Sequence, residues 1–377
     1  MSDIIYLDNG ATTKPLKLAL EKASVFNEEK YFNASALYNY GLDVHKELNY
    51  AKKTLQNAFS NDFDVIFTSC GTESDNTAIF SYTKRGNAVT TLGEHSAVYN
   101  PINTLKNQGY DVRFANLNLD GSVNVNSLLS LIDKNTVFVS VVHVNNETGA
   151  INDINKIAKL VKEINPRIVF HSDGVQAFMK IPFKPSEFID LYSVSAHKIN
   201  GLKGVGALFK NKKLNTLKPY LIGGGQENGY RSGTENSFGI KVFEYATAFH
   251  YENLITHYNN AIKLKSAFLK GLNSEYFTII SSENSSPYII TLSANGLKGE
   301  VIQHMLEMEN IIIGTGSACS SKNRHSRMLK SIGYDDKVLD GVLRISFSFE
   351  TTIEEVEKTV EILNKKVKEL KLTMKVQ

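Results

Sequence analysis

The sequence predicts an α/β protein whose main sheet is mostly parallel, followed by a smaller α+β domain. Between about residues 60 and 210, short β-branched and aromatic runs alternate with helical patterns. Several of these runs are apolar on both faces, and the pattern changes after about residue 255. Strands covered by helices on both faces are apolar throughout, and their alternation with helices is typical of a parallel sheet.

Seven runs predict the strands of the main sheet. They are DVIFTS (64–69), NAVTTL (87–92), YDVRFANL (110–117), NTVFVSVVHV (135–144), RIVFHSD (167–173), LYSVSA (191–196) and VGALFK (205–210). Between the fourth and fifth runs, residues 153–164 are apolar at helical spacing. Asp153 is placed as the N-cap of this helix, and Pro166 lies just beyond its end.

The region after residue 255 predicts a long helix, further strands and a final helix. The strand runs are YFTIISS (276–282), YIITLSAN (288–295), NIIIGTG (310–316) and VLRISFSF (342–349). At the start of the final helix, either Thr351 with Glu354 or Thr352 with Glu355 fits a capping box. We expect the two domains to be joined by a helix and not by a flexible linker.

Composition and charge exclude several classes of function. The net charge of +3 over 377 residues is too small to indicate direct binding of nucleic acid or of a membrane surface. Two cysteines without CxxC spacing predict neither a disulfide framework nor a metal site. The sequence shows neither a secretory leader pattern nor an apolar run of membrane-spanning length, so we expect a cytoplasmic protein.

Polar residues that follow the predicted strands are the candidate functional groups, because ligands of open α/β sheets bind at the carboxyl ends of strands. Lys198 follows one strand, and Asp173 ends the preceding one. A desolvated lysine can act as a nucleophile or form a Schiff base, and an acidic partner can hold the pyridine nitrogen of pyridoxal phosphate (PLP). The alternatives are a solvated lysine and an Asx-turn residue.

Further candidates stand at other strand ends. Gly71 and Thr72 open a helix after a strand, which suits either a phosphate group or an ordinary N-cap. His95 fits stacking on a ring or proton transfer, and also a packed histidine. Asn145 and Gln176 fit hydrogen bonds to a ring hydroxyl, and also to the backbone. No strand is followed by GxGxxG, and GxxxxGK[ST] is absent from the sequence, so dinucleotide and P-loop sites are not predicted.

Nine motifs in order resemble the cysteine desulfurases, which belong to the class V aminotransferase group of fold-type I PLP enzymes. They are YLDNGATT, FTSCGTESDN, GEHSAV, HVNNETG, HSDGVQ, SAHKINGLKGVGAL, GGGQENGYRSGTEN, GSACSS and LRISFSFETT. The resemblance runs nearly end to end. It implies a large PLP-binding domain over 15–255, with a seven-stranded sheet between helices. It also implies a small domain formed by 1–14 and 256–377, which carries a catalytic cysteine.

The resemblance also implies a role for individual residues. Lys198 would form the Schiff base with PLP, Asp173 would bind its ring nitrogen, and His95 would stack on the ring. Arg344 would bind the substrate carboxylate, with Asn33 beside it. The remaining implied contacts are Gln176 and Asn145 to the ring oxygen, Gly71, Thr72, Ser195 and His197 to the phosphate, and Thr234 to the phosphate of the other subunit of a homodimer.

Cys319 lies in GTGSACSSKN (314–323), among glycines and serines, and matches the catalytic cysteine of the family. The resemblance implies that its thiolate takes sulfur from L-cysteine and leaves L-alanine. A persulfide on a glycine-flanked loop then passes to an acceptor for iron–sulfur cluster assembly or tRNA thiolation. The long loop favours the longer-loop branch of the family. Cys70, at a helix N-terminus, is either reactive or simply a small residue that fits.

The chain departs from the family pattern in places, and other functions stay open. Tyr38 stands where relatives usually carry a histidine, and the segment after Cys319 lacks the usual proline. Arg324, His325 and Arg327 there predict either a surface for an acidic acceptor or a solvated charged loop. The alternatives in function are a selenocysteine lyase, a cysteine sulfinate desulfinase, a class V aminotransferase, or a scaffold without catalytic activity.

Overall fold

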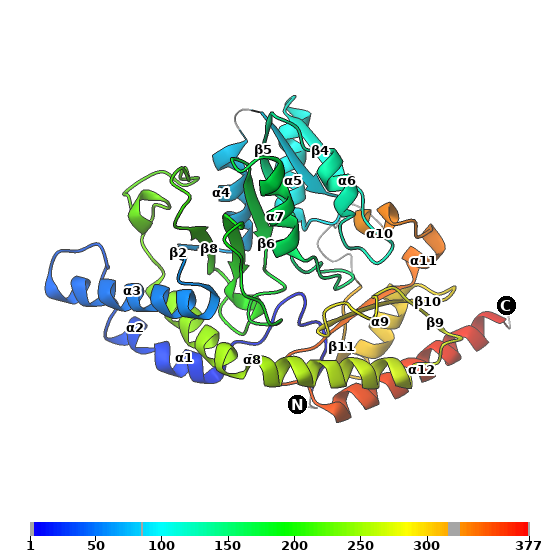
Figure 1. Cartoon of the computed structure of the whole chain (residues 1–377). Helices are drawn as coiled ribbons and strands as arrows, with labels where there is room; N and C mark the ends of the chain where they lie inside the picture. The colour runs from blue at the N-terminus through cyan, green and yellow to red at the C-terminus, as the bar shows by residue number, and fades with distance from the viewer. Residues whose placement is uncertain (1–3, 84–85, 316–324, 376–377) are drawn as a thin grey trace.

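The computed structural model describes residues 4–83, 86–315 and 325–375. Its main feature is a seven-stranded sheet, and all seven predicted runs form its strands (Figure 1). In sheet order the strands are β2 (Phe63–Thr68), β8 (Gly206–Asn211), β7 (Leu191–Ser195), β6 (Val169–Asp173), β5 (Thr136–Ser140), β3 (Asn87–Thr91) and β4 (Asp111–Ala115). Strands β7, β6, β5, β3 and β4 are parallel, and β8 runs antiparallel to both of its neighbours. The prediction of a mostly parallel sheet is confirmed.

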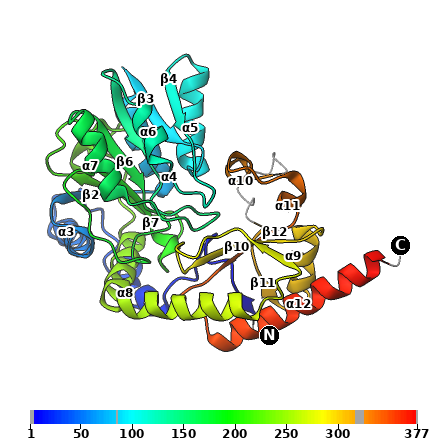
Figure 2. The same cartoon turned by 45° about the vertical axis from the view of Figure 1, so that its right-hand side comes forward.

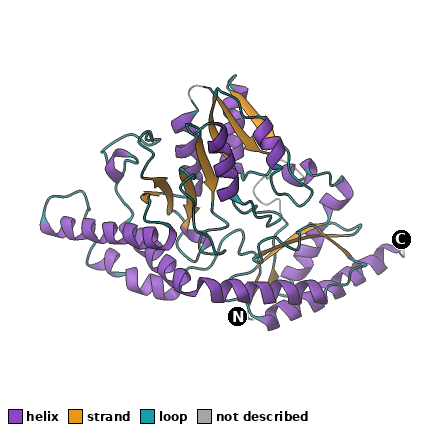
Figure 3. Cartoon of the chain, viewed as in Figure 1, coloured by secondary structure: helices purple, strands orange, loops and turns teal. Residues whose placement is uncertain are grey.

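Helices cover both faces of this sheet (Figure 3). They are α3 (Asn39–Phe59), α4 (Gly71–Tyr82), α5 (Ser96–Asn107), α6 (Val125–Ser130) and α7 (Ile154–Ile164). Alternate strand residues belong to two separate cores: Ile66 packs with α4 and α5, whereas Val65 and Phe67 pack with α3 and α7. Burial on both faces explains why the strand sequences are apolar throughout.

The C-terminal part forms two smaller sheets. Strands β9 (Phe277–Ile279), β10 (Ile289–Ala294) and β12 (Val342–Ser346) are antiparallel, and β11 (Ile311–Ile312) pairs in parallel with β1 (Ile5–Tyr6). The helices of this part are α9 (Gly299–Glu307), α10 (Arg327–Ser331), α11 (Asp336–Asp340) and α12 (Ile353–Lys375). Figure 2 shows α10 and α11 above the small sheet. The pairing of β1 brings the start of the chain into the core of the C-terminal part.

One long helix, α8 (Ser237–Gly271), joins the two parts and passes through the predicted boundary at residue 255 (Figures 1 and 2). It packs against α1 (Lys17–Ala23), α2 (Val25–Glu28) and α3, and further along against α12. The remaining elements are the 3₁₀ turns η1 (Ala196–Lys198) and η2 (Glu227–Gly229). Within the described ranges, none of the helices is both long and apolar enough to cross a bilayer. The division at residue 255 stays a prediction.

Candidate active site

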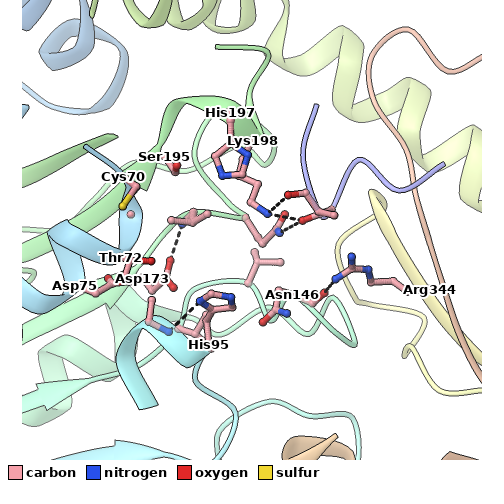
Figure 4. A pocket seen from close by; sticks show the side chains of 18 residues that line it. Cys70, Thr72, Asp75, His95, Asn146, Asp173, Ser195, His197, Lys198 and Arg344 are labelled. Atoms are coloured by element: carbon pink, nitrogen blue, oxygen red, sulfur yellow. Dashed lines mark hydrogen bonds between the residues drawn. The ribbon is translucent and has the colours of Figure 1, made fainter. Parts of the chain in front are cut away.

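A cavity of roughly 260 Å³ lies at the carboxyl ends of the central strands (Figure 4). Two strand ends, the first turns of α4 and α5, the segment after β1, and β12 all contribute to its walls. Nine residues predicted from the sequence line it: Gly71, Thr72, His95, Asp173, Gln176, Ser195, His197, Lys198 and Arg344. Residues that are far apart in the sequence therefore meet in one pocket.

Lys198 ends η1, directly after β7, and its side chain is half-buried. Its Nζ donates to the carbonyl oxygens of Gly10, at 2.6 Å, and Ala11, at 2.8 Å. Both acceptors belong to the YLDNGATT motif, so the N-terminal segment positions this amine. The alternative interpretation, a solvated strand-end lysine, does not fit this half-buried and hydrogen-bonded side chain.

Asp173 is the last residue of β6 and is only 4% exposed. Its Oδ1 accepts a hydrogen bond from the amide of Val175 at 2.9 Å. Burial, and next the negative charge of Asp75, raise the pKa of Asp173 to about 7. A cationic group bound in the cavity would stabilise the charged form of this carboxylate. The protonated ring nitrogen of PLP is such a group.

The start of α4 forms a cradle for an anion. Its N-cap residue, Cys70, is extended, and Gly71 and Thr72 open the helix toward the cavity, where backbone N–H groups lack helical acceptors. A Cβ atom at Gly71 would approach Cγ2 of Val175 to 2.8 Å, so glycine keeps this space open. Ser195 Oγ is buried in the same wall and has no hydrogen-bond partner within the described part of the chain. An orphaned donor beside a helix N-terminus fits a phosphate group, so these residues fit PLP.

His95 is the N-cap of α5, and its Nδ1 accepts a hydrogen bond from the amide of Ala97 at 3.1 Å. This leaves the proton of the neutral ring on Nε2. Burial, and then the positive charges of Lys198, Arg327 and Arg344, lower the pKa of His95 to about 4. The imidazole is therefore neutral at physiological pH and available within the cavity.

The two predicted amides are placed differently. Gln176 lines the cavity, where its Nε2 donates to the Gly10 carbonyl at 2.8 Å and its Oε1 accepts from Lys180 at 3.0 Å. Burial, followed by the charges of Lys198 and Arg344, lowers the pKa of Lys180 to about 7.

Asn145 is 1% exposed and is not among the residues that line the cavity. Its side chain bonds to the backbone of Gly93, Glu147 and Thr148, each at 2.8 Å. The expected contact of Asn145 with a ring oxygen is therefore not seen, because its amide holds the turn together. The next residue, Asn146, faces the cavity instead.

Arg344 extends from β12 into the cavity and is 5% exposed. Its Nη2 donates to Asp8 Oδ1 at 2.8 Å, and its Nη1 donates to the Asn146 carbonyl at 3.0 Å. Its buried Nε has no hydrogen-bond partner among the described residues. The guanidinium is thus held in place by two of its five N–H donors, and its Nε–H is among those left for an anion.

Three further predictions fall outside the cavity or outside the described residues. Asn33 is exposed, and its Oδ1 accepts from the amide of Ser35 at 2.8 Å in a local turn. Thr234 is exposed in the loop after η2. Cys319 and Arg324 lie outside the described residues.

Two of the three residues of the charged segment after Cys319, His325 and Arg327, lie within the described part of the chain. Arg327 is half-buried, and its guanidinium lies 3.4 Å from the ring centroid of Tyr99. His325 contacts Asp336 at 3.1 Å and Asp340 at 2.7 Å. Neither side chain is a freely solvated cation or part of an open basic surface, because each is used in a contact within the chain.

Sequence reasoning missed Asp75. This residue is fully buried in α4 and lines the cavity, and burial raises its pKa to about 7. Its Oδ1 lies 3.4 Å from Nε2 of His171. The available signal was its spacing: Asp75 stands three and four residues after Thr72 and Gly71, on the same face of a helix.

Comparisons with known proteins agree with this site. A family model described as aminotransferase class-V matches residues 5–359. Cysteine desulfurase IscS of Dictyoglomus turgidum is 32% identical over 97% of this chain and 95% of its own length. Cysteine desulfurase IscS of Clostridium botulinum is 33% identical over 98% of this chain and 96% of its own length.

Solved structures give the same result. A NifS-like protein superposes with a TM-score of 0.90 at 30% identity, over 97% of this chain and all of its own. The NifS-like protein of Rickettsia africae superposes with a TM-score of 0.88 at 26% identity, over the same shares. The chain therefore belongs to the PLP-dependent cysteine desulfurases of the class-V aminotransferase family.

Proposed function

We propose that this cavity takes sulfur from L-cysteine, releases L-alanine, and leaves a persulfide on Cys319. The observation that supports this most strongly is the meeting of Lys198 and Asp173 in one pocket, beside an anion cradle and a buried arginine. A buried amine, a buried carboxylate and two anion sites match the functional groups of PLP together with those of an amino acid.

In this proposal the cavity holds the cofactor by both ends. Lys198 would bind its aldehyde carbon, Asp173 its ring nitrogen and Gln176 its ring oxygen. The phosphate contacts would come from Gly71, Thr72, Ser195 and His197. When bound, PLP acts as an electron sink for the substrate Cα.

The side chains of the chain then move protons and hold the substrate. The Lys198 amine, once free, removes the Cα proton, and the carbonyls of Gly10 and Ala11 keep it within reach. Neutral His95, whose Nδ1 is used by the amide of Ala97, would stack on the ring and hold an exchangeable proton on Nε2.

Arg344 binds the substrate carboxylate. Its buried Nε is an available donor, and Asp8 holds the guanidinium in its present orientation through Nη2. A substrate carboxylate therefore meets a cation that is already partly neutralised, which favours reversible binding.

Cys319 receives the sulfur. Its thiolate attacks the substrate sulfur, so that an S–S bond forms and the C–S bond breaks. The electron pair of that bond stays with the substrate carbon, which leaves as alanine after protonation. The backbone of Gly314, five residues before Cys319, pairs with that of Arg344 in both directions, at 2.9 and 2.7 Å. The cysteine-bearing segment therefore begins beside the proposed substrate carboxylate site.

An assay of three substrates tests this function. The purified protein, loaded with PLP, is incubated separately with L-cysteine, L-selenocysteine and L-cysteine sulfinate, and alanine and protein-bound sulfur are measured. We expect alanine from L-cysteine, with one protein-bound persulfide per alanine in a single turnover. Alanine formed only from selenocysteine would instead support a selenocysteine lyase, and alanine formed only from the sulfinate would support a desulfinase. Absence of alanine with all three would support the aminotransferase or the scaffold.

We also propose a homodimer in which Thr234 contacts the phosphate in the partner subunit. Thr234 is exposed and outside the cavity of its own chain. It lies in the segment between β8 and α8, which also contains Ile222, 87% exposed. Tyr31, Leu37 and Tyr40 add apolar surface before and at the start of α3, exposed by 67%, 90% and 65%. Exposed apolar side chains of this size, together with an exposed Thr234 that does not reach the cavity of its own chain, favour a second copy as the partner.

The dimer predicts a specific effect on cofactor affinity. Thr234→Ala is expected to weaken PLP binding about tenfold, as loss of one hydrogen bond to a charged group would. Thr373→Ala, at an exposed threonine of α12, is the control and is expected to bind PLP as the parent does. Equilibrium dialysis measures the affinity, and light scattering measures the mass. A monomer with parental affinity in Thr234→Ala would contradict the proposal.

The persulfide needs an acceptor. The resemblance supports an acceptor protein in iron–sulfur cluster assembly or tRNA thiolation, and a cytoplasmic location. Tracing sulfur from radiolabelled cysteine to co-purifying proteins would identify that acceptor.

A further inference from the structure

Arg327 connects the two parts of the molecule beside the proposed active site. It is the first residue of α10, the first helix after the segment that contains Cys319. Its Nη2 donates to the Glu94 carbonyl at 2.6 Å, and its Nε donates to the Leu92 carbonyl at 3.2 Å. Both acceptors lie between β3 and α5, directly before His95. One side chain of the C-terminal part therefore holds the backbone that presents the histidine.

The guanidinium also stacks on an aromatic ring. Its central carbon lies 3.4 Å from the ring centroid of Tyr99, which stands on the first turns of α5. Two directed N–H bonds and a stacked ring require the planar fork of arginine. Lysine carries the same charge but cannot reproduce this set of contacts.

Other contacts hold α10 firmly against the same region. Ser326 caps the helix by accepting from the amide of Leu329 at 3.1 Å. Met328 and Leu329 belong to an apolar cluster that includes Leu117 of the main α/β part. Because the Ser326 cap and the packing of Met328 and Leu329 hold α10 in place, the position of Arg327 beside the His95 backbone does not depend on its own hydrogen bonds alone.

The charge of Arg327 acts on the imidazole as well. The pKa of His95 is lowered first by burial and then by the positive charges of Lys198, Arg327 and Arg344. The carboxylate of Asp173 lines the same cavity, and the buried Glu94 side chain turns away to the amide of Val142.

We propose that Arg327 is a positioning residue, which fixes the backbone that presents His95. The inference rests on the proposed role of His95.

Two variants and a matched control test this role in the PLP-loaded enzyme. Arg327→Gln removes the charge and most of the contacts, and Arg327→Lys keeps only the charge. Lys330→Gln removes an exposed charge from the same helix. The only described ion pair of Lys330 is with Asp336, at 3.3 Å. For each variant, kcat/KM for L-cysteine is measured from pH 4 to 9, and Tm reports folding.

We expect kcat/KM to fall about tenfold to a hundredfold in both Arg327 variants, because a small misplacement of a catalytic group has effects of this size. The acid limb of the profile should move to higher pH in Arg327→Gln, since a positive charge near His95 is lost, and should stay in place in Arg327→Lys. Lys330→Gln should match the parent in both respects.

The inference is overturned if Arg327→Gln matches Lys330→Gln, or if its kcat/KM falls while the acid limb stays in place, since a purely structural role would give that result. If Arg327→Gln fails to fold, a parental kcat/KM in Arg327→Lys overturns it. A parent enzyme that forms no alanine would instead contradict the proposed function.

Discussion

Replacement of Lys198 by alanine is expected to abolish alanine formation from L-cysteine, with a loss of at least about 10³-fold, the scale seen when a member of a catalytic set is removed. The amine follows the carboxyl end of β7. It donates hydrogen bonds to two backbone carbonyls, at 2.6 and 2.8 Å, and these fix its position. In the proposed function it binds the cofactor and also removes the Cα proton, so its loss removes both. Alanine release and the visible absorption of the purified protein measure the two effects separately.

Lys203→Ala is the matched control for this prediction. Lys203 is an exposed lysine of the same SAHKINGLKG motif, five residues further along the chain, and does not line the cavity. It should retain parental turnover and the parental visible spectrum. Substantial alanine formation by Lys198→Ala would show that the proton is removed by another group, and the proposed role of Lys198 would be wrong.

The sequence predicted the fold and much of the site because both depend on local pattern. Burial on both faces forces each strand of a parallel sheet to be apolar, so the seven strands could be found without knowledge of their order. The rule that ligands bind at carboxyl ends of strands then selected Lys198, Asp173 and Gly71. Asp153 as an N-cap was also confirmed, since its side chain accepts from the amide of Lys156 at 3.0 Å.

Features that depend on distant contacts could not be predicted. The sequence offered two equal capping boxes for α12. Only the fold selects Thr352 with Glu355, because the Thr351 hydroxyl is used by the amide of Ser348. Asn145 was expected to face the cavity, but its side-chain amide forms hydrogen bonds with three backbone groups. One of them, the Gly93 carbonyl, is 52 residues away in the sequence, so this contact could not be predicted from local pattern.

Arg327 is the clearest case of this limit. The residues that precede it, from Ser320 to Ser326, are all charged or polar, so a solvated loop was a reasonable expectation. Its actual partners, Leu92, Glu94 and Tyr99, stand more than two hundred residues earlier. Thr234 illustrates a different limit, since its proposed contact requires a second copy of the chain.

Replacement of Cys319 by alanine is expected to abolish persulfide formation and to lower alanine release from L-cysteine by about 10³-fold or more. The substrate C–S bond breaks only when a nucleophile takes the sulfur, and water is a poor substitute for a thiolate. The cofactor contacts proposed above do not include this residue, so the variant should bind PLP with parental affinity. Mass spectrometry of the protein after one turnover detects the bound sulfur, and an alanine assay measures the turnover.

Cys70→Ala is the control that separates a specific thiol from any thiol near the cavity. Cys70 is half-buried at the N-cap of α4 and lines the pocket, so it is the other candidate sulfur acceptor in the sequence. We expect Cys70→Ala to form the persulfide and alanine at close to the parental rate. Parental turnover of L-cysteine by Cys319→Ala would exclude the thiolate mechanism and favour a lyase that releases its product without a protein thiol. Loss of the persulfide in Cys70→Ala, with Cys319 intact, would move the acceptor role to the phosphate cradle.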